Sequence, residues 1–326
     1  MNFQNRLQKA CMAYASQGPM PKFSVDCSIL VSGSPEQAYP IVRDFKEWRG
    51  WSPWLIMEEA AEMSVAPDGD SYTWAGKLVG EGGMTLQKEK PFSSIHFGLE
   101  FIKPWKSRAD IAFYFEEEGD QTRVRWTMES QLPWFLFWMK GMMTTFISMD
   151  YNRGLGMLKD RIELGAVPSV LEIVGEKSFS GTPFVGRKTT CKMADIAAAM
   201  AEEMKAIDAW VTSSGIPTAE QAFSIYHAFD MKRGETTFTT GIPAPDGDVP
   251  LVEGMVSGEI PALSTFQIRH TGPYRHLGNA WSAGMLRDRN KVFKKDKSFP
   301  PFEIYTNDPV NTPEERVETV VHFPLK

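Results

Sequence analysis

The sequence predicts an α+β protein of two domains: an antiparallel sheet covered by a long helix, and then a duplicated β-α-β-β module. The 326 residues are long for one hydrophobic core, and 42% hydrophobic and 12% aromatic residues are typical of a globular chain. Strands with period-two alternation occupy much of residues 22–128. Farther along, Phe223-Ser224-Ile225-Tyr226 is nearly repeated as Phe302-Glu303-Ile304-Tyr305, with an acid in the second copy only.

The composition argues against several classes of function. The formal charge is -6 and no run of lysine and arginine recurs at helical spacing, so we expect no nucleic-acid partner. The cysteines, Cys11, Cys27 and Cys191, are odd in number and widely spaced, which favours neither a disulfide framework nor a metal site. We therefore expect a reducing, cytoplasmic compartment, no metal and no cofactor.

Two apolar stretches are candidates for membrane segments. In residues 1–21, interpreted as an N-terminal extension, the apolar run 10–15 is too short for a signal peptide or a membrane span. Residues 132–149 are longer but are interrupted by Lys140, and we interpret them as a lid that leads into a helix. The third and weakest hypothesis for the function is peripheral membrane association, through the tryptophan, phenylalanine and methionine side chains of residues 134–143.

The elements of the first domain, residues 22–165, follow in order. Residues 23–31 alternate as a half-buried strand, and Ser34 with Pro35 predicts the N-cap and first position of a helix that ends near Asp44. Further strands are predicted at 71–78, 82–89, 95–101, 111–115 and 124–128. One face of this sheet is aromatic and needs a cover, for which residues 144–164 are long enough as a helix.

Aromatic residues of this domain have a structural and a functional interpretation. Core packing is the simpler one for Phe97, Phe113 and Trp126, which line a cavity only where the sheet face is incompletely filled. Three tryptophans at three-residue spacing are predicted to wedge the short helices against the sheet: Trp48, Trp51 and Trp54.

The motifs DFKEW (44–48), WSPW (51–54), YTWAG (72–76), GEGGM (80–84) and TRVRWTM (122–128) occur in this order. With them the domain resembles the SRPBCC superfamily, the START-like helix-grip fold, in its polyketide-cyclase-like branch. The resemblance implies a curved sheet gripping a long C-terminal helix, with an apolar cavity for a hydrophobic molecule between them. The cavity residues that it implies are Phe97, Phe113, Trp126, Trp74 and Met84.

The second domain, residues 166–326, follows a Gly-Ala-Val-Pro boundary at 165–168. Copy one is predicted as strand 184–190, helix 193–211 and strands 222–228 and 236–242; copy two as strand 264–270, a helix from 273, and strands 301–306 and 317–323. Phe223 and Phe302 stand 79 residues apart, and Pro243 and Pro324 stand 81 apart. Two similar spacings in order predict a duplication.

The motifs RHTGPY (269–274), AW (280–281), FEIY (302–305), NDP (307–309) and VHFPL (321–325) resemble the GyrI-like small-molecule-binding domain, which is also the effector-binding domain of AraC-type regulators. The resemblance implies two modules about a pseudo-twofold axis with a ligand groove between them. It implies that Glu303 contacts a cationic or polar ligand and that Tyr274, Trp281 and Tyr305 line the groove. Tyr226 and Ser224 are expected to face the groove from copy one. No helix-turn-helix module is evident in the sequence.

Glu303 is the residue on which the functional hypotheses depend. A carboxylate is rare in a hydrophobic strand unless it is solvated, paired or available to a cationic ligand. In an aromatic groove, desolvation would raise its pKa, and an organic cation would restore the charged form and add cation–π contact. The alternative is an internal ion pair with Arg269 or Lys192.

Two classes of function remain. The favoured hypothesis is a binding protein for a small hydrophobic or cationic molecule, acting as a sensor, sequestering protein or carrier. The alternative is a hydrolase or cyclase that acts on a reactive small molecule, with Glu303 as general base and Tyr305 or Tyr274 as hydrogen-bond donor. The sequence contains no nucleophile-elbow pattern, metal-ligand cluster or phosphate-binding loop, which favours the binding protein.

Overall fold

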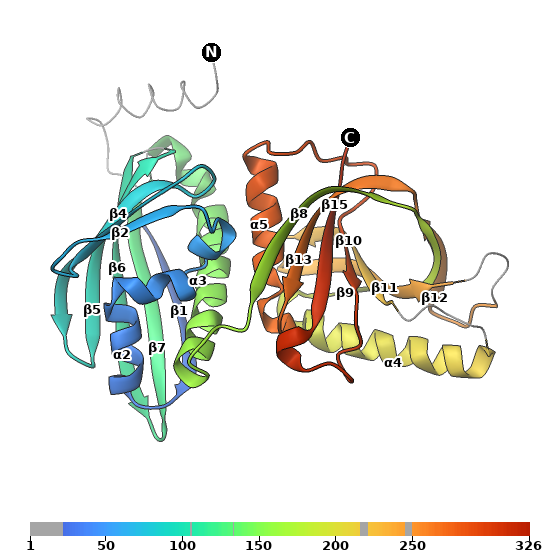
Figure 1. Cartoon of the computed structure of the whole chain (residues 1–326), viewed down its shortest axis with the longest axis horizontal. Helices are drawn as coiled ribbons and strands as arrows, with labels where there is room; N and C mark the ends of the chain where they lie inside the picture. Colours follow the sequence, from blue (N-terminus) through green and yellow to red (C-terminus); the bar gives the residue numbers. More distant parts are fainter. Residues whose placement is uncertain (1–21, 105, 133, 216–220, 245–249) are drawn as a thin grey trace, which may run out of the picture. The chain divides into compact units, whose positions relative to one another are not determined.

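The computed structural model describes residues 22–104, 106–132, 134–215, 221–244 and 250–326, with the backbone alone at 134–136 (Figure 1). Its contacts divide the chain into two compact units, Met1–Val167 and Pro168–Lys326. The extension predicted at residues 1–21, with Cys11, lies outside the described residues.

Within the described part of the N-terminal unit, strands form a seven-stranded antiparallel sheet in the order β1-β7-β6-β5-β4-β3-β2 (Figure 1). The first strand pairs with the last, so that Lys22 lies opposite Gln131 and Ser32 lies opposite Gln121. All other pairs join strands that are neighbours in sequence. The bounds are β1 Lys22–Ser32, β2 Glu62–Val65, β3 Ser71–Gly76, β4 Gly80–Lys90, β5 Ser94–Lys103, β6 Ser107–Glu118 and β7 Gln121–Gln131.

Helices cover one face of this sheet. Helix α2 (Pro35–Arg43) begins where predicted, and the Gln37 side chain accepts the backbone N–H of Ser34 at 3.0 Å, as in a capping box. The 3-10 helices η1 (Phe45–Gly50) and η2 (Leu55–Met57) follow it. Helix α3 (Lys140–Glu163) packs against β1 and β7 and is the covering helix that the sequence predicted.

The core of this unit is a cluster of aromatic rings. Trp48 and Trp51 are fully buried and their ring centroids lie 4.6 Å apart, so they pack as the predicted wedge. Trp126 of β7 stacks on Phe113 of β6 at 4.8 Å and on Tyr151 of α3 at 3.9 Å. This stack joins the sheet to the covering helix.

Within the described part of the C-terminal unit, eight strands form one antiparallel sheet in the order β12-β9-β11-β10-β14-β15-β13-β8. Helix α4 (Ile196–Ser214) packs on β9 and β11, and α5 (Gly278–Arg289) packs on β13 and β15. Gly215, with φ of 66°, provides the left-handed cap that ends α4. The bounds are β8 Val170–Phe179, β9 Thr182–Lys192, β10 Phe223–Asp230, β11 Glu235–Pro243, β12 Met255–Ile260, β13 Leu263–Thr271, β14 Phe302–Tyr305 and β15 Glu318–Pro324.

The two near-identical tetrapeptides meet in the middle of this sheet. Strands β10 and β14 pair antiparallel, with Phe223 opposite Ile304 and Ile225 opposite Phe302. Ser224 therefore lies directly opposite Glu303. The position at which the two copies differ is the position at which they face each other.

The prediction missed the short β2 and two edge strands of the second sheet. Strand β8 pairs with β13, and β12 pairs with β9, so the order of elements is β-β-α-β-β from β8 to β11 and again from β12 to β15, rather than β-α-β-β. The strand that begins each of these two runs lies beside a strand of the other run. Both are edge strands without strict alternation of buried and exposed residues, which is why period-two analysis did not find them.

Candidate functional site

Glu303 lies in the centre of the C-terminal sheet with its side chain buried. Alternation along β14 places Phe302 in an apolar cluster with Phe223 and Ile225, and turns Glu303 and Tyr305 to the other face, as predicted. Glu303 is only 2% exposed. A carboxylate at this depth requires partners.

The partners of Glu303 are three neutral donors. The hydroxyl groups of Tyr226 and Tyr305 donate to its Oε2 at 3.0 and 2.8 Å, and the indole N–H of Trp281 donates to its Oε1. The hydroxyl of Tyr305 also lies 3.0 Å from Ser224 Oγ, so Ser224 joins the cluster through Tyr305. The fold thus brings these five residues of the predicted site together.

No cation pairs with Glu303 among the residues that the structure describes. Arg269 pairs with Glu172, and Lys192 Nζ lies 2.9 Å from a carboxylate oxygen of Glu235. The alternative of an internal ion pair between Glu303 and either base is therefore wrong.

Burial controls the protonation of the site. Desolvation raises the pKa of Glu303, although the hydrogen bonds from its neighbours lower that pKa in part. Burial, with the adjacent carboxylate, raises the pKa of Tyr226 and of Tyr305 well above the ordinary value, so both phenols stay protonated and can donate. The charged form of Glu303 is disfavoured unless a positive charge enters the site.

Aromatic rings surround the carboxylate. Trp281 of α5 lies edge-on to Tyr226, with ring centroids 4.9 Å apart. Tyr274 lies edge-on to Tyr305 at 5.6 Å and is 41% exposed, so it stands at the solvent side of the cluster. Burial raises the pKa of the Tyr274 hydroxyl to about 12.

Two neighbours of the site were missed. Strict alternation along β10 would turn Phe229 away from Tyr226, but the register of β10 shifts between Tyr226 and Ala228, and the two rings stack with centroids 5.6 Å apart. Met200 of α4 lies 3.6 Å from Tyr305 Oη through its sulfur. No feature of the sequence marks the shift in register, and the helix that carries Met200 is remote from β14 along the chain.

The residues predicted to line a cavity in the N-terminal unit share one face of its sheet. Phe97 and Phe113 are fully buried, Trp126 is 1% exposed and Met84 is 3% exposed. Trp74 is half-buried and lies edge-on to Phe101. Ring-to-ring contacts between these residues and the helices occupy this face.

The predicted lid forms the 3-10 helix η3 (Trp134–Met139) and the start of α3. The side chains of residues 134–136 lie outside the description, whereas Phe137, Trp138 and Met142 are 63%, 67% and 44% exposed. Within the described residues, every helix is too short or too polar to cross a membrane.

Comparison with known families identifies both halves of the chain. Residues 22–163 match the family described as polyketide cyclase / dehydrase and lipid transport. Residues 176–326 match the GyrI-like small molecule binding domain. The predicted fusion of an SRPBCC-type domain with a GyrI-like domain is confirmed.

Solved structures resemble parts of the chain at low identity. EcmrR in a complex with DNA is 15% identical, with 58% of this chain and 71% of that chain covered and a TM-score of 0.41. The C-terminal domain of EcmrR is 16% identical over 48% of this chain and 98% of that chain, with a TM-score of 0.41. The Aha1 dimer from Colwellia psychrerythraea is 21% identical over 44% of this chain and 97% of that chain, with a TM-score of 0.32. No curated protein matches the chain.

Proposed function

We propose that this chain, which joins a polyketide-cyclase-type domain to a GyrI-like small-molecule-binding domain, binds an organic cation with an apolar body at Glu303. In this role it acts as a sensor, a sequestering protein or a carrier. The observation that carries the proposal is a carboxylate, 2% exposed, that receives hydrogen bonds from neutral donors and has no cationic partner within the described residues.

Charge provides the driving force for binding. A cation beside Glu303 stabilises the ionised carboxylate, and this interaction is stronger in a desolvated site than in water. The rings of Tyr226, Trp281 and Tyr305 supply apolar contact and cation–π attraction to the body of the ligand. We propose that the ligand enters the site beside Tyr274, the exposed ring of the cluster.

We further propose that the C-terminal unit is a duplication with a pseudo-twofold axis between Ser224 and Glu303. The matching order of strands in the two halves of the sheet and the pairing of the two tetrapeptides support this. Related positions on the two sides of the axis then differ in charge. A ligand placed on the axis would therefore bind with its positive end toward β14.

Titration with a cationic dye such as ethidium, followed by tryptophan fluorescence, tests the proposal. Glu303→Gln keeps the size of the side chain and removes its charge, and we expect the Kd to rise by about tenfold or more, since a charged contact contributes roughly 1.5–3 kcal/mol. Trp281→Phe should weaken the quenching, because that indole lies against Glu303. Glu172→Gln, an exposed carboxylate of the same sheet, is the matched control. Equal affinity of the parent and Glu303→Gln would refute the proposal.

A catalytic role is the second candidate for the same site. Once ionised, a carboxylate with a raised pKa, held by two phenol hydroxyls, is suited to accept a proton from an attacking water. Incubation with a panel of activated esters and other electrophiles should then show turnover that Glu303→Gln abolishes. Absence of turnover across the panel would leave binding as the function.

We also propose a second, apolar ligand site in the N-terminal unit, along the face that carries Phe97, Phe113, Trp126, Trp74 and Met84. The family match and the aromatic character of that face support it. Because Trp126 stacks on Tyr151, a ligand would have to separate sheet and helix rings to enter. Native mass spectrometry of the purified protein should show an apolar molecule that Met84→Trp, which fills the face, excludes.

A further inference from the structure

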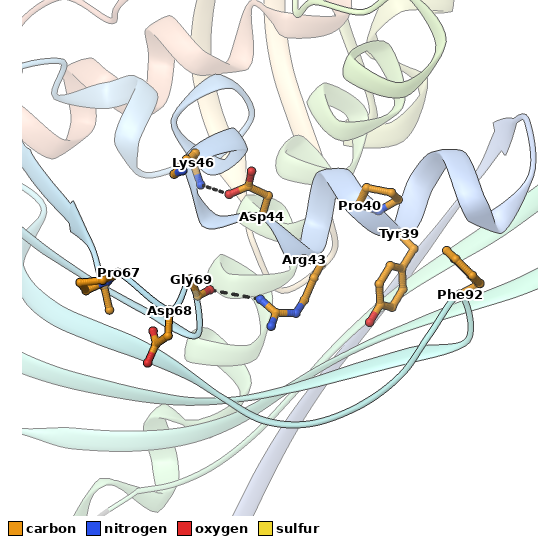
Figure 2. Close-up of a pocket in the computed structure, with 10 residues that line it drawn as sticks. Tyr39, Pro40, Arg43, Asp44, Lys46, Pro67, Asp68, Gly69 and Phe92 are labelled. Atoms are coloured by element: carbon orange, nitrogen blue, oxygen red, sulfur yellow. Dashed lines mark hydrogen bonds between the residues drawn. The ribbon is translucent and has the colours of Figure 1, made fainter.

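A pocket on the surface of the N-terminal unit lies apart from both predicted sites. Its volume is about 500 Å³, within the usual range of small-molecule sites. It is open to solvent and is lined by the end of α2, the start of η1, and the turns β2–β3 and β4–β5 (Figure 2). Figure 2 shows Tyr39 and Phe92 at one end and Asp68 at the other, with Arg43 between them.

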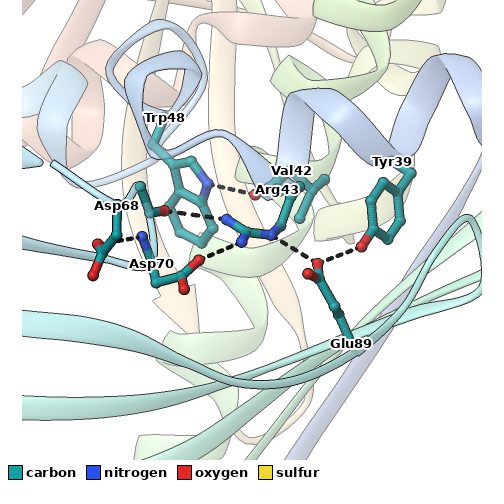
Figure 3. A network of polar contacts seen from close by, with 8 residues as sticks. Tyr39, Val42, Arg43, Trp48, Asp68, Asp70 and Glu89 are labelled. Atoms are coloured by element: carbon teal, nitrogen blue, oxygen red, sulfur yellow. Dashed lines mark hydrogen bonds and ion pairs between the residues drawn. The ribbon is translucent and has the colours of Figure 1, made fainter. Parts of the chain in front are cut away.

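Arg43 connects the elements that line this pocket, and all of its guanidinium nitrogens are used in these contacts. Its Nε donates to Glu89 Oε2 at 2.7 Å, its Nη1 donates to the carbonyl of Gly69 at 3.1 Å, and its Nη2 pairs with Asp70 (Figure 3). The hydroxyl of Tyr39 donates to the same oxygen of Glu89 at 2.5 Å. All three guanidinium nitrogens are engaged, so Arg43 joins helix α2 to two hairpins and is not available to an anionic ligand.

Negative charge is in excess around the pocket. Two carboxylates line it, Asp44 and Asp68, together with two cations, Arg43 and Lys46. The charge of Arg43 is already opposed by Asp70 and Glu89, so four carboxylates stand against two cations in this region. One oxygen of Asp44 accepts the backbone N–H of Lys46 at 2.9 Å, and one oxygen of Asp68 accepts the backbone N–H of Asp70 at 3.0 Å. Within the described residues, the second oxygen of each of these two carboxylates has no hydrogen bond, so both remain able to pair with a cation.

Phe92 forms the aromatic wall of the pocket under backbone strain. Its φ is 59°, a conformation in which bulky residues are rare, and its side chain is 45% exposed. The ring lies edge-on to Tyr39 with centroids 5.4 Å apart. A glycine at this position would remove the backbone strain. Because the Phe92 ring is nearly half exposed, its burial contributes little to the stability of the fold. Strain of this kind is concentrated where a side chain has a binding role.

We propose that this pocket binds a small organic cation, with its positive group at Asp44 and Asp68 and its apolar body against Tyr39 and Phe92. The proposal is independent of the site at Glu303. An anion of the same shape meets the carboxylates of Asp44 and Asp68 and, within the described residues, one lining cation that is free of ion pairs, Lys46. The pocket therefore selects by charge as well as by the apolar ring that Phe92 exposes.

The test uses the full-length Glu303→Gln protein, in which cation binding at the first site is weakened by about tenfold or more. Phenyltrimethylammonium is titrated by isothermal calorimetry, with benzenesulfonate as the anion that has the same ring. We expect the ammonium ion to bind this protein and benzenesulfonate to bind at least about tenfold more weakly. Adding Asp68→Asn should weaken the ammonium by about threefold to tenfold, the effect of one partly exposed charge.

Phe92→Gly removes the ring and suits the positive φ, so the turn keeps its backbone path, and we expect binding to weaken by about threefold to tenfold. Asp120→Asn, an exposed carboxylate in the β6–β7 turn of the same unit, is the matched control and should bind as before. Any of three results overturns the proposal: no binding to Glu303→Gln, equal affinity for the cation and the anion, or no effect of both Asp68→Asn and Phe92→Gly. Binding to the parent that vanishes in Glu303→Gln would overturn this inference while it supports the site at Glu303.

Discussion

At the scale of single residues, Glu303 shows how a functional side chain can oppose stability. Its burial is compensated by hydrogen bonds from Tyr226 and Tyr305 to Oε2 and from Trp281 to Oε1. An amide oxygen can take the place of Oε2, but the amide NH2 then takes the place of Oε1 and cannot accept the indole N–H. The negative charge itself has no counterpart within the described residues. A buried carboxyl group without a counter-ion weakens the fold, and under the proposed function it is retained for binding.

Glu303→Gln should therefore remove a pH-dependent loss of stability while it weakens binding. The pKa of Glu303 is raised by burial in the folded state, so its contribution to stability is present at low pH and is lost as pH rises through the folded-state pKa. Relative to the parent, we expect the free energy of unfolding of the variant to be roughly 1–3 kcal/mol higher at pH 8 than at pH 5, because the lost indole acceptor costs the same at both pH values. Urea denaturation of both proteins at the two pH values measures this difference. A difference between variant and parent that is the same at both pH values would contradict the argument.

Two buried histidines predict that stability falls as the pH falls, which is opposite to the dependence expected from Glu303. Burial lowers the pKa of His270 and of His322 to about 4, so both are neutral in the folded protein at pH 6. The unfolded chain, with a histidine pKa of about 6.5, binds protons first as pH falls. Stability is then full above pH of about 6.5 and declines toward pH 4, by on the order of 3 kcal/mol for each histidine.

Urea midpoints measured between pH 7 and 4.5 should show this decline, and His322→Gln should make it shallower. His322 stacks on Phe302 at 4.5 Å, so the variant will also lose some stability at pH 7, and the slope rather than the absolute value is the test. An unchanged slope would mean that His322 is not neutral when buried.

At the scale of elements, helix α5 packs closely on its sheet because Gly284 has no side chain. A Cβ on Gly284 would overlap a ring carbon of Phe323, which is buried on β15. Glycine is normally the poorer helix former by about 1 kcal/mol. Here the close approach of helix and strand outweighs that preference, because a methyl group would separate them.

Gly284→Ala should accordingly destabilise the C-terminal unit by about 1–3 kcal/mol. Gly156→Ala in α3 is the matched control, since no atom lies within 4 Å of the position that its Cβ would take. It should stabilise by about 0.5–1 kcal/mol. Thermal unfolding followed by circular dichroism compares the two, and the same sign for both would contradict the packing argument.

At the scale of the whole molecule, the chain is two units with separate cores. The aromatic cluster around Trp48 and Trp126 belongs to the first, and the clusters around Val185 and Phe223 belong to the second. Sheet pairing does not cross the division between Val167 and Pro168 in the described residues.

Residues 1–167 and 168–326, expressed separately, should each fold. Each fragment contains a complete sheet with its covering helices, so we expect a cooperative urea transition for each and native-like circular dichroism. The second fragment alone should retain the binding of a cationic dye at Glu303. A fragment that remains unfolded in the absence of the other would contradict this division.

Much of the local structure was predictable from the sequence. The start of α2 followed from Ser34 and Pro35, because capping is a matter of a few adjacent residues. The alternation in Phe302-Glu303-Ile304-Tyr305 predicted correctly that Glu303 and Tyr305 share a face. The motifs predicted both families, and the repeated tetrapeptide predicted a relation between two distant strands.

Other features required the tertiary structure. The shift in register that turns Phe229 onto Tyr226 depends on how β10 pairs with its neighbours. The pairing of β8 with β13 and of β12 with β9 depends on strand edges that carry no local pattern. The pocket at Arg43 depends on a helix and two turns that are 20 or more residues apart in sequence.

The sequence by itself determined the two domains, the faces of most strands and the acid around which the second domain is organised. These follow from alternation, capping and composition, which act between neighbours along the chain. The tertiary structure decided that Glu303 has no counter-ion in the described residues and that Arg43 is already paired. Which charged groups form ion pairs depends on which of them the fold brings together, because the partners are distant in sequence.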